Sequence, residues 1–243
     1  MLIYGINPVL EALRAGRVTE LRISDRGGAS LRDVIKVAER EHVPVRRVGQ
    51  GDLDRAAKGG VHQGVVADLS EAGEVSLEDL VARATGAPLI VVMDGVEDPH
   101  NVGAILRTVD AAGATGVVRQ SRHAAPLGGA AAKTSAGAVT HVAIAEVVNI
   151  ARALDQLKEL GVWTVGLAGD GPTRYDEIDL TLPTAVVVGA EGNGLRRLVR
   201  ARCDWVASLP MRGHVQSLNV SVATGIVLFE AVRQRGRGKE NAG

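Results

Sequence analysis

Short apolar runs alternate with longer mixed segments from residue 89 onward, and this alternation defines the predicted fold. The runs lack the regular apolar–polar alternation of half-exposed strands, so they indicate strands buried on both faces. Strand–helix alternation of this kind predicts a parallel sheet with helices on both faces, an α/β fold. The expected strands cover residues 89–93, 116–118, 142–145, 163–167, 185–188 and 206–209, and the expected helices cover 102–112, 130–136, 150–160, 195–203 and 219–233.

The first 70 residues form a second, smaller pattern of the same α/β kind. A helix is expected over 8–15, with Asn7 as its cap and Pro8 at its first position. Strands are expected over 20–24, 43–48 and 64–69, and a further helix over 30–41. Residues 71–87 are small and polar, with one short helical pattern at 77–84. We therefore predict domains at 1–70 and 88–236, a linker at 71–87 and a flexible tail at 237–243.

Composition narrows the class of protein without naming a function. The 243 residues include 30 glycines, five aromatic residues and equal numbers of acidic and basic residues, which is a globular composition. No apolar run approaches the roughly 18 residues of a membrane span, and no signal peptide is evident, so we expect a cytoplasmic protein. One cysteine, Cys203, excludes an internal disulfide and a multi-thiolate zinc site, and we expect it to serve packing.

Zero net charge weakens the general case for nucleic-acid binding, but the distribution of charge favours a polyanionic ligand. Arg119, Arg122 and Lys133 lie in a stretch, residues 113–140, that holds no acidic residue. Solvated helix faces are the simpler interpretation of each basic cluster. With so few aromatic residues, base-stacking platforms are disfavoured, so RNA would be bound through its shape, phosphates and backbone groups.

The common nucleotide and metal signatures are missing. No G-x-G-x-x-G motif follows the first strand of either block, which disfavours a standard dinucleotide fold. Residues 128–134 resemble a P-loop, but Ala132 stands where the glycine before Lys133 is required. Lys133 remains a candidate for contact with RNA phosphate. The histidines are scattered and lack the spacing of metal ligands, so no metal is expected.

Three segments carry the candidate chemistry, at residues 94–108, 186–195 and 209–221. In each, small and polar residues follow a strand directly, and ligands of open α/β sheets bind at such carboxyl ends. Glu191 faces the site or is stabilised by the following helix dipole. Ser217 and Asn219 cap a helix or face a substrate. The three segments together predict one composite site.

The sequence leaves open the roles of two residues in the segment of residues 94–108. Asn101 is a helix cap or a site residue. Arg107 lies about 600° further round the helix, so the two do not share a face. Arg107 therefore reaches a phosphate or a partner subunit, or pairs with Asp110 on the surface.

The order and spacing of these segments resemble the three motifs of the SpoU (TrmH-like) RNA 2′-O-methyltransferases of the SPOUT superfamily. The motifs are Asn101 to Thr108, Val188 to Leu195, and Leu209 to Ala223. Tyr4 to Leu13 and Val61 to Ala67 are similar to the family's N-terminal RNA-binding domain, itself like a small ribosomal protein of the L30e type. The likeness covers nearly the whole chain and is greatest to members that methylate a guanosine ribose in 23S rRNA.

The resemblance implies a catalytic domain with a C-terminal trefoil knot, S-adenosylmethionine (AdoMet) as cofactor and a homodimer with the site at its interface. The implied catalytic residues are Arg107, Asn101, Glu191, Ser217 and Asn219. The implied cofactor-binding residues are Gly189, Ala190, Gly192, Leu209, Met211 and Leu218. The family's proposed base is the first-motif arginine, here Arg107, although a guanidinium rarely gives up its proton, so Arg107 would hold a phosphate or stabilise the developing alkoxide instead. Gln216 departs from the family pattern, in which small residues are frequent there.

Three functions compete at this point. The leading one is AdoMet-dependent 2′-O-methylation of a guanosine in 23S rRNA, on free rRNA or an assembling particle. A tRNA 2′-O-methyltransferase is the alternative within the superfamily, and the N-terminal block disfavours it. A catalytically silent RNA-binding or assembly protein is the third, and the complete set of polar motif residues disfavours it.

Overall fold

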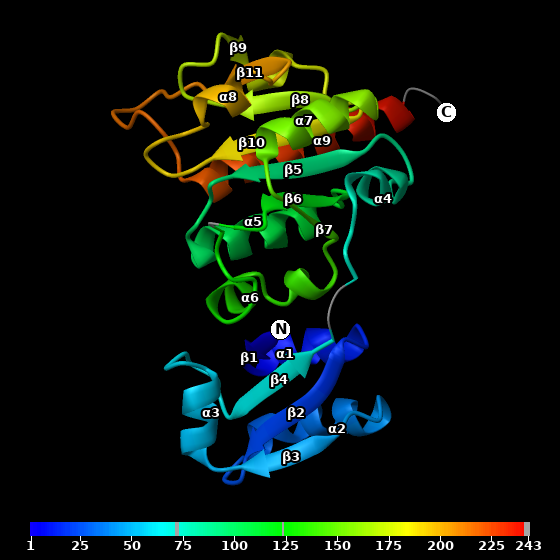
Figure 1. Cartoon of the computed structure of the whole chain (residues 1–243), viewed down its shortest axis with the longest axis vertical. Coiled ribbons are helices and arrows are strands. Elements are labelled where there is room, and N and C mark those ends of the chain that lie inside the picture. The colour runs from blue at the N-terminus through cyan, green and yellow to red at the C-terminus, as the bar shows by residue number, and fades with distance from the viewer. Residues whose placement is uncertain (71–72, 123, 241–243) are drawn as a thin grey trace. The chain divides into compact units, whose positions relative to one another are not determined.

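The computed structural model describes residues 1–70, 73–122 and 124–240 (Figure 1). Its contacts divide the chain into two compact units. The first contains Met1–Gly73, Val102–Arg107 and Ala125–His141, and the second contains Glu74–Asn101, Thr108–Ala124 and Val142–Gly243. Both units combine strands and helices, as the sequence predicts, and no helix of the described residues is long and apolar enough to cross a membrane.

The first unit is built on a four-stranded sheet in the order β1-β4-β2-β3. Only β2 and β3 run parallel. α1 and α2 bury one apolar side each, including Val9 and Leu13 of α1 and Val34 of α2. The elements are β1 (Leu2–Tyr4), α1 (Ile6–Arg14), β2 (Val18–Ser24), η1 (Ala29–Leu31), α2 (Arg32–Arg40), β3 (Val45–Val48), α3 (Gln50–Ala56) and β4 (Val65–Leu69).

Residues 125–141 also belong to the first unit, although they are far along the chain from the N-terminal sheet. They contain α6 (Ala130–Thr134) and the 3₁₀ turn η2 (Ala138–Thr140). Glycines allow the close approach, because a Cβ on Gly128 would lie 2.5 Å from the Leu2 carbonyl oxygen, and one on Gly137 would lie 2.5 Å from the Glu11 Cβ. This packing joins segments that the predicted domain division, at 1–70 and 88–236, had kept apart.

The second unit contains a seven-stranded sheet whose strands all run parallel, as the sequence predicts. The order is β7-β6-β5-β10-β8-β11-β9, so β10 is inserted between β5 and β8. The elements are α4 (Leu77–Ala82), β5 (Leu89–Asp94), α5 (Pro99–Ala111), β6 (Gly116–Gln120), β7 (Ile144–Val147), α7 (Ile150–Glu159), β8 (Trp163–Leu167), β9 (Thr173–Arg174), η3 (Tyr175–Glu177), β10 (Thr184–Gly189), α8 (Arg197–Arg200), β11 (Trp205–Ser208) and α9 (Val220–Glu240).

Helices cover the seven-stranded sheet (Figure 1). Alternate residues of β5 and β10, among them Ile90, Val92 and Val187, pack with α4 and α7 in one apolar cluster. α9 packs on β10 and buries Val227 and Leu228. Burial of these apolar side chains is the main force that holds the sheet and its helices together.

The structure differs from the sequence prediction mainly at element ends. The N-cap of α1 is Gly5 rather than Asn7, because Gly5 adopts a φ of 95° and the exposed Ile6 N–H donates to the Gln63 side chain instead. β1, α3 and the two-residue β9 were not predicted, since each is too short to carry a periodic pattern. α9 extends to Glu240, into the segment where a tail was expected, and residues 241–243 lie outside the described residues.

Candidate functional site

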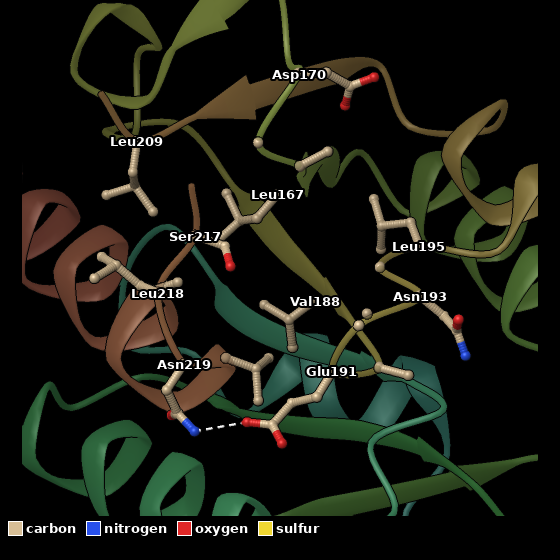
Figure 2. A pocket seen from close by; sticks show the side chains of 18 of the residues that line it. Leu167, Asp170, Val188, Glu191, Asn193, Leu195, Leu209, Ser217, Leu218 and Asn219 are labelled. Carbon is tan, nitrogen blue, oxygen red and sulfur yellow. Dashed lines mark hydrogen bonds between the residues drawn. The ribbon is translucent and has the colours of Figure 1, made fainter. Parts of the chain in front are cut away.

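A pocket of about 580 Å³ opens at the carboxyl ends of β8, β10 and β11 (Figure 2). This is the edge of the sheet where the sequence predicted a composite site. Its walls combine leucine and valine side chains with exposed backbone and few charged groups. The lining residues are Leu167, Ala168, Gly169, Asp170, Val188, Gly189, Ala190, Glu191, Gly192, Asn193, Gly194, Leu195, Arg200, Ala207, Leu209, Met211, Gln216, Ser217, Leu218, Asn219, Val220 and Ala223.

The loop after β10 is folded so tightly that only glycine fits at its start. A Cβ on Gly189 would lie 2.1 Å from the Gly194 carbonyl carbon, well inside any real contact. Gly192 and Gly194 adopt φ values of 76° and 62°, which glycine tolerates without strain. Ala190 and Gly194 form a β-bridge that closes the loop. The glycines therefore bring backbone atoms to the pocket wall, as the sequence predicted for a flat ligand.

An ion pair between a half-exposed arginine and a buried carboxylate fixes the far end of this loop. The Asp94 carboxylate, fully buried at the end of β5, accepts hydrogen bonds from the Arg196 backbone N–H (2.8 Å) and from its Nε (2.6 Å). Arg196 is the N-cap of α8 and directly follows the glycine loop. A buried carboxylate without such a partner would be costly, so the pair ties β5 to the loop. No sequence pattern predicts this contact, because the two residues lie 102 positions apart.

Asn219 connects the second and third motif segments through its side-chain amide. Its Oδ1 accepts from the Ser221 backbone N–H at 2.9 Å and so caps α9, as one of the two sequence interpretations held. That bond fixes the orientation of the amide, so Nδ2 points the other way. Nδ2 donates to Glu191 Oε1 at 2.7 Å, the dashed line in Figure 2, and to Asn101 Oδ1 at 2.9 Å. Asn219 is thus both a cap and a site residue.

Asn101 is not a helix cap. Asp98 caps α5 by accepting from the His100 backbone N–H at 3.0 Å, and Pro99 takes the first position of the helix. Asn101 lies inside the first turn, 5% exposed, where its carbonyl oxygen meets Asn219. The sequence misplaced the cap by three residues because both side chains can fill that role.

Arg107 is exposed on α5 and is not among the residues that line the pocket. The ion pair with Asp110 that sequence spacing allowed is not formed. Among the residues that the structure describes, Arg107 has no hydrogen-bond or ion-pair partner. Its guanidinium is therefore available to a ligand.

The pocket brings together the predicted cofactor residues. Gly189, Ala190, Gly192, Leu209, Met211 and Leu218 all line it. Ser217 lines it too, and its hydroxyl makes no hydrogen bond to the described residues. Gln216, which departs from the family pattern, is also a lining residue.

Residues 167–170 and Arg200 also line this pocket and were not predicted from the sequence. Leu167 ends β8 beside β10, so the rule that ligands bind at carboxyl ends would have pointed to it. Asp170 accepts a hydrogen bond from Arg200 at 2.7 Å, which lowers the pKa of the Asp170 carboxyl below its usual value.

The three predicted RNA-binding residues are placed differently. Arg122 and Lys133 are exposed. Arg119 is buried on β6, 3.5 Å from Glu146, and its Nη1 has no hydrogen-bond partner among the described residues. Burial lowers the pKa of its guanidinium. This placement does not suit contact between Arg119 and RNA, because the side chain is buried and not presented to solvent. The position of Arg119 at the end of a predicted buried strand could have indicated its burial, whereas its charge suggested exposure.

Cys203 packs beside the pocket wall, as expected, and is not a nucleophile. A Cβ on Gly166 of β8 would lie 2.9 Å from the Cys203 Sγ, which shows how closely the thiol packs on that strand. Burial raises the pKa of the Cys203 thiol to about 12, so the reactive thiolate is negligible at neutral pH. No cluster of three or more His, Cys, Asp or Glu side chains suited to a metal ion occurs among residues 1–70, 73–122 and 124–240.

Comparison with known proteins places the chain among RNA methyltransferases. The model of the SpoU rRNA Methylase family matches residues 88–229, and that of the RNA 2′-O ribose methyltransferase substrate binding domain matches residues 2–74. The 23S rRNA (guanosine-2′-O-)-methyltransferase RlmB of Pseudomonas putida is 45% identical over 239 residues, covering 96% of both chains.

Two solved structures share the fold over nearly the whole chain. The SpoU methyltransferase AviRb from Streptomyces viridochromogenes, in complex with AdoMet, superposes with a TM-score of 0.82 at 26% identity, covering 98% of this chain and 91% of that one. An AdoMet-bound rRNA methyltransferase from Sinorhizobium meliloti gives a TM-score of 0.79 at 26% identity, covering 96% and 86%.

Proposed function

Because the chain belongs to the SpoU rRNA methylase family, we propose that it transfers a methyl group from AdoMet to the ribose 2′-hydroxyl of a guanosine in 23S rRNA. One observation carries the proposal. The polar side chains of all three motif segments, Asn101, Glu191 and Asn219, meet in one hydrogen-bonded group, of which Glu191 and Asn219 line the pocket. The guanosine and the 23S rRNA rest on the likeness to RlmB.

The pocket suits AdoMet in size and in chemistry. Its volume, about 580 Å³, lies within the range of small-molecule sites. Leu167, Leu209 and Leu218 offer apolar surface to an adenosyl group, and the Gly189 turn leaves backbone atoms free to bond its polar edges. When bound there, AdoMet supplies an electrophilic methyl carbon on a sulfonium.

The reaction forms a bond between the ribose 2′-oxygen and the methyl carbon while the carbon–sulfur bond breaks. The bonding pair stays on sulfur, which becomes a neutral thioether, and the hydroxyl proton passes to solvent water. Positioning contributes most to such a displacement. A ribose hydroxyl both donates and accepts hydrogen bonds, so carboxylate and amide groups can orient it. We assign this role to Glu191, held by Asn219, with Asn101 fixing the amide and Ser217 as a further hydroxyl partner.

Arg107 acts on the RNA substrate in this proposal. Its unpaired, exposed guanidinium suits an RNA phosphate or the negative charge that develops on the 2′-oxygen. A guanidinium rarely gives up its proton, which disfavours a role for Arg107 as general base. Arg122 and Lys133, both exposed, and the N-terminal unit provide further contacts to RNA in this proposal.

We infer that the protein works as a homodimer through α9. Val222 and Phe229 are two turns apart, so they share a face of the helix, and they are 49% and 51% exposed. Val232 adds to this stripe at 39% exposure. A Cβ on Gly225 would lie 3.5 Å from Thr108 Cγ2, so the stripe lies next to α5, which carries Arg107. A second copy covering the stripe would therefore approach the catalytic arginine.

Two further parts of the proposal follow from family membership. We infer that the chain is threaded as a trefoil knot in the segment of β10, β11 and α9, where the third motif returns to pack on β10. The substrate places the protein in the cytoplasm, where bacterial ribosomes are assembled.

Mass spectrometry of rRNA and tRNA from a deletion strain tests the function. We expect the loss of one 2′-O-methylguanosine in 23S rRNA, restored by the intact gene and not by an Arg107→Ala form. Unchanged rRNA methylation together with a missing tRNA methylation would instead identify the protein as a tRNA methyltransferase. Unchanged methylation of both rRNA and tRNA would favour a catalytically silent RNA-binding or assembly protein.

A further inference from the structure

Both tryptophans of the chain line a second pocket and are about half exposed. The sequence contains only Trp163 and Trp205, and they are 48% and 47% exposed. This pocket has a volume of about 270 Å³, less than that of most small-molecule sites. Its lining residues are Trp163, Val165, Thr173, Glu177, Ile178, Asp179, Leu182, Thr184 and Trp205. The proposed methyl transfer uses none of them.

The register of the sheet explains why the two indoles meet. Trp163 and Val165 lie two residues apart on β8 and share a face, and Trp205 of β11 pairs with Val165. Trp163 and Trp205 each begin their strand, so the pocket lies at the amino ends of the parallel strands. On β8 the cofactor pocket begins at Leu167, about 13 Å along the strand from Trp163. At the edge of the sheet the two pockets adjoin, because Thr173 of the second pocket pairs with Ala207 of the cofactor pocket.

Two of the residues that line the second pocket are charged, and both are acidic. Glu177 and Asp179 are exposed at the pocket. Arg174, the nearest cation, is 3.7 Å from Glu177, but it donates both Nε and Nη2 to Asp176. Arg235 is turned toward the backbone, where it donates to the carbonyl oxygens of Ala87, Pro88, Leu180 and Leu182. Glu177 shares Arg174 with Asp176, and Asp179 accepts from the backbone N–H and hydroxyl of Thr181, which are neutral donors. The pocket therefore keeps a net negative charge beside its two half-exposed indoles, which suits a further cation.

We propose that this pocket binds an arginine side chain of a basic partner polypeptide. Tryptophan is the best aromatic surface for a cation, and the weakly hydrated, planar guanidinium stacks on it more readily than an ammonium group does. Glu177 and Asp179 supply the matching negative charge. A nucleic acid is disfavoured, because its phosphates would approach these carboxylates. The site shares no residue with the proposed RNA-binding set and tethers the enzyme to a protein.

Intrinsic fluorescence tests this proposal directly, since both tryptophans of the 243-residue chain line the pocket. The probe is a capped glycine-rich hexapeptide with two arginines, titrated alongside lysine and citrulline versions of the same peptide. We expect a saturable change with the arginine peptide, a weaker response with lysine, and none with citrulline, which keeps the shape and lacks the charge. Equal responses to the arginine and citrulline peptides, or no saturable response, would overturn the proposal.

Variants test the same site without removing its apolar walls. Glu177→Gln should weaken arginine-peptide binding at least about threefold, while Glu159→Gln, on the exposed end of α7, should leave it unchanged. AdoMet binding should be normal in both. A short single-stranded RNA that changes the fluorescence more strongly than the arginine peptide would make the pocket a base-stacking surface and refute the proposal. A peptide-free fluorescence change that follows protein concentration would refute it in favour of contact between copies.

Discussion

The oxygen and the nitrogen of the Asn219 side-chain amide have different roles: the oxygen caps a helix, and the nitrogen binds other site residues. The cap on α9 uses Oδ1 and so directs Nδ2 to Glu191 and Asn101. An aspartate would cap the helix equally well but would place a carboxylate oxygen against the Glu191 carboxylate. The residue type is therefore set by the site and not by the helix. The sequence left cap and substrate roles as alternatives because spacing alone cannot reveal that one amide serves both.

Arg107→Ala should reduce turnover far more than cofactor affinity. The guanidinium is outside the AdoMet pocket, so the dissociation constant for AdoMet should stay within about twofold, while kcat on RNA falls by about 10²- to 10³-fold. Isothermal titration and single-turnover methylation measure the two quantities. Arg107→Lys serves as the charge-preserving comparison. Equal losses in affinity and turnover would remove Arg107 from the catalytic step.

Gly189→Ala should reduce AdoMet binding. Its new Cβ would lie 2.1 Å from the Gly194 carbonyl carbon, so the loop must move, at a cost of about 1–3 kcal/mol or roughly 5- to 150-fold in affinity. Gly213→Ala is the matched control, because nothing lies within 4 Å of a Cβ there. Calorimetric titration with AdoMet compares the variants. Unchanged binding by Gly189→Ala would show that the tight turn does not shape the pocket.

At the scale of elements, pairing of β8 with β11 depends on a side chain as well as on the strand ladder. The Asp204 carboxylate accepts from the Thr164 backbone N–H (2.8 Å) and hydroxyl (2.7 Å), and lies 2.9 Å from Lys158 of α7. Burial acts to raise the pKa of Asp204, but the hydrogen bonds from Lys158 and Thr164 outweigh it and lower the pKa below 3.8. This carboxylate therefore stabilises the junction of two strands and a helix.

Asp204→Asn should destabilise the protein by about 1–3 kcal/mol at neutral pH. A carboxyl group whose pKa is depressed on folding stabilises the native state above its unfolded pKa, and the contribution disappears as the pH falls through the folded value. The gap between wild type and variant should therefore be constant above about pH 5 and shrink below pH 3.8. Urea unfolding over this pH range measures it.

Asp155→Asn is the control for this experiment. Asp155 pairs with Arg202 at 2.8 Å, but both side chains are substantially exposed, so its removal should change stability by less than about 1 kcal/mol. A pH-independent effect of Asp204→Asn, or an equal effect in both variants, would contradict the role given to Asp204.

The helices and strands were largely predictable from the sequence, because most long apolar runs form buried strands and most segments with a helical period form helices in the structure. The strand of residues 163–167 matches β8 in full, and the helix of 150–160 matches α7 to within one residue. The cap of α1 was not predictable, since the partner of its first N–H is Gln63, distant in sequence. α8 is much shorter than its pattern, because Arg196 is engaged by Asp94 at its start.

At the scale of the whole molecule, Phe229→Glu should convert the proposed dimer into a monomer. A charge placed in the exposed stripe of α9 would be buried without a partner when two copies meet. Sedimentation velocity should show half the mass, and methylation should fall with it. Val148→Glu, at a residue 79% exposed between β7 and α7, should leave both unchanged. A wild-type protein that sediments as a monomer at the concentrations of the assay would refute the proposed dimer.

The two-block organisation followed from the sequence, but the composition of the first unit did not. Two glycine contacts, Gly128 with Leu2 and Gly137 with Glu11, bring residues 125–141 onto the N-terminal sheet. No local pattern encodes a contact between segments more than 100 residues apart. The candidate site was easier to predict, because three strand ends of one parallel sheet must meet at the same edge.

The packing of Cys203 makes the protein ready for site-specific labelling. Its thiol is the only one in the chain, and its raised pKa, about 12, keeps it protonated and slow toward maleimides and other thiol reagents at pH 7. A cysteine introduced at an exposed position would react first, with the native residue left in place. Dyes or spin labels could thus be attached to either unit, and the movement of one against the other followed during RNA binding in an otherwise unaltered enzyme.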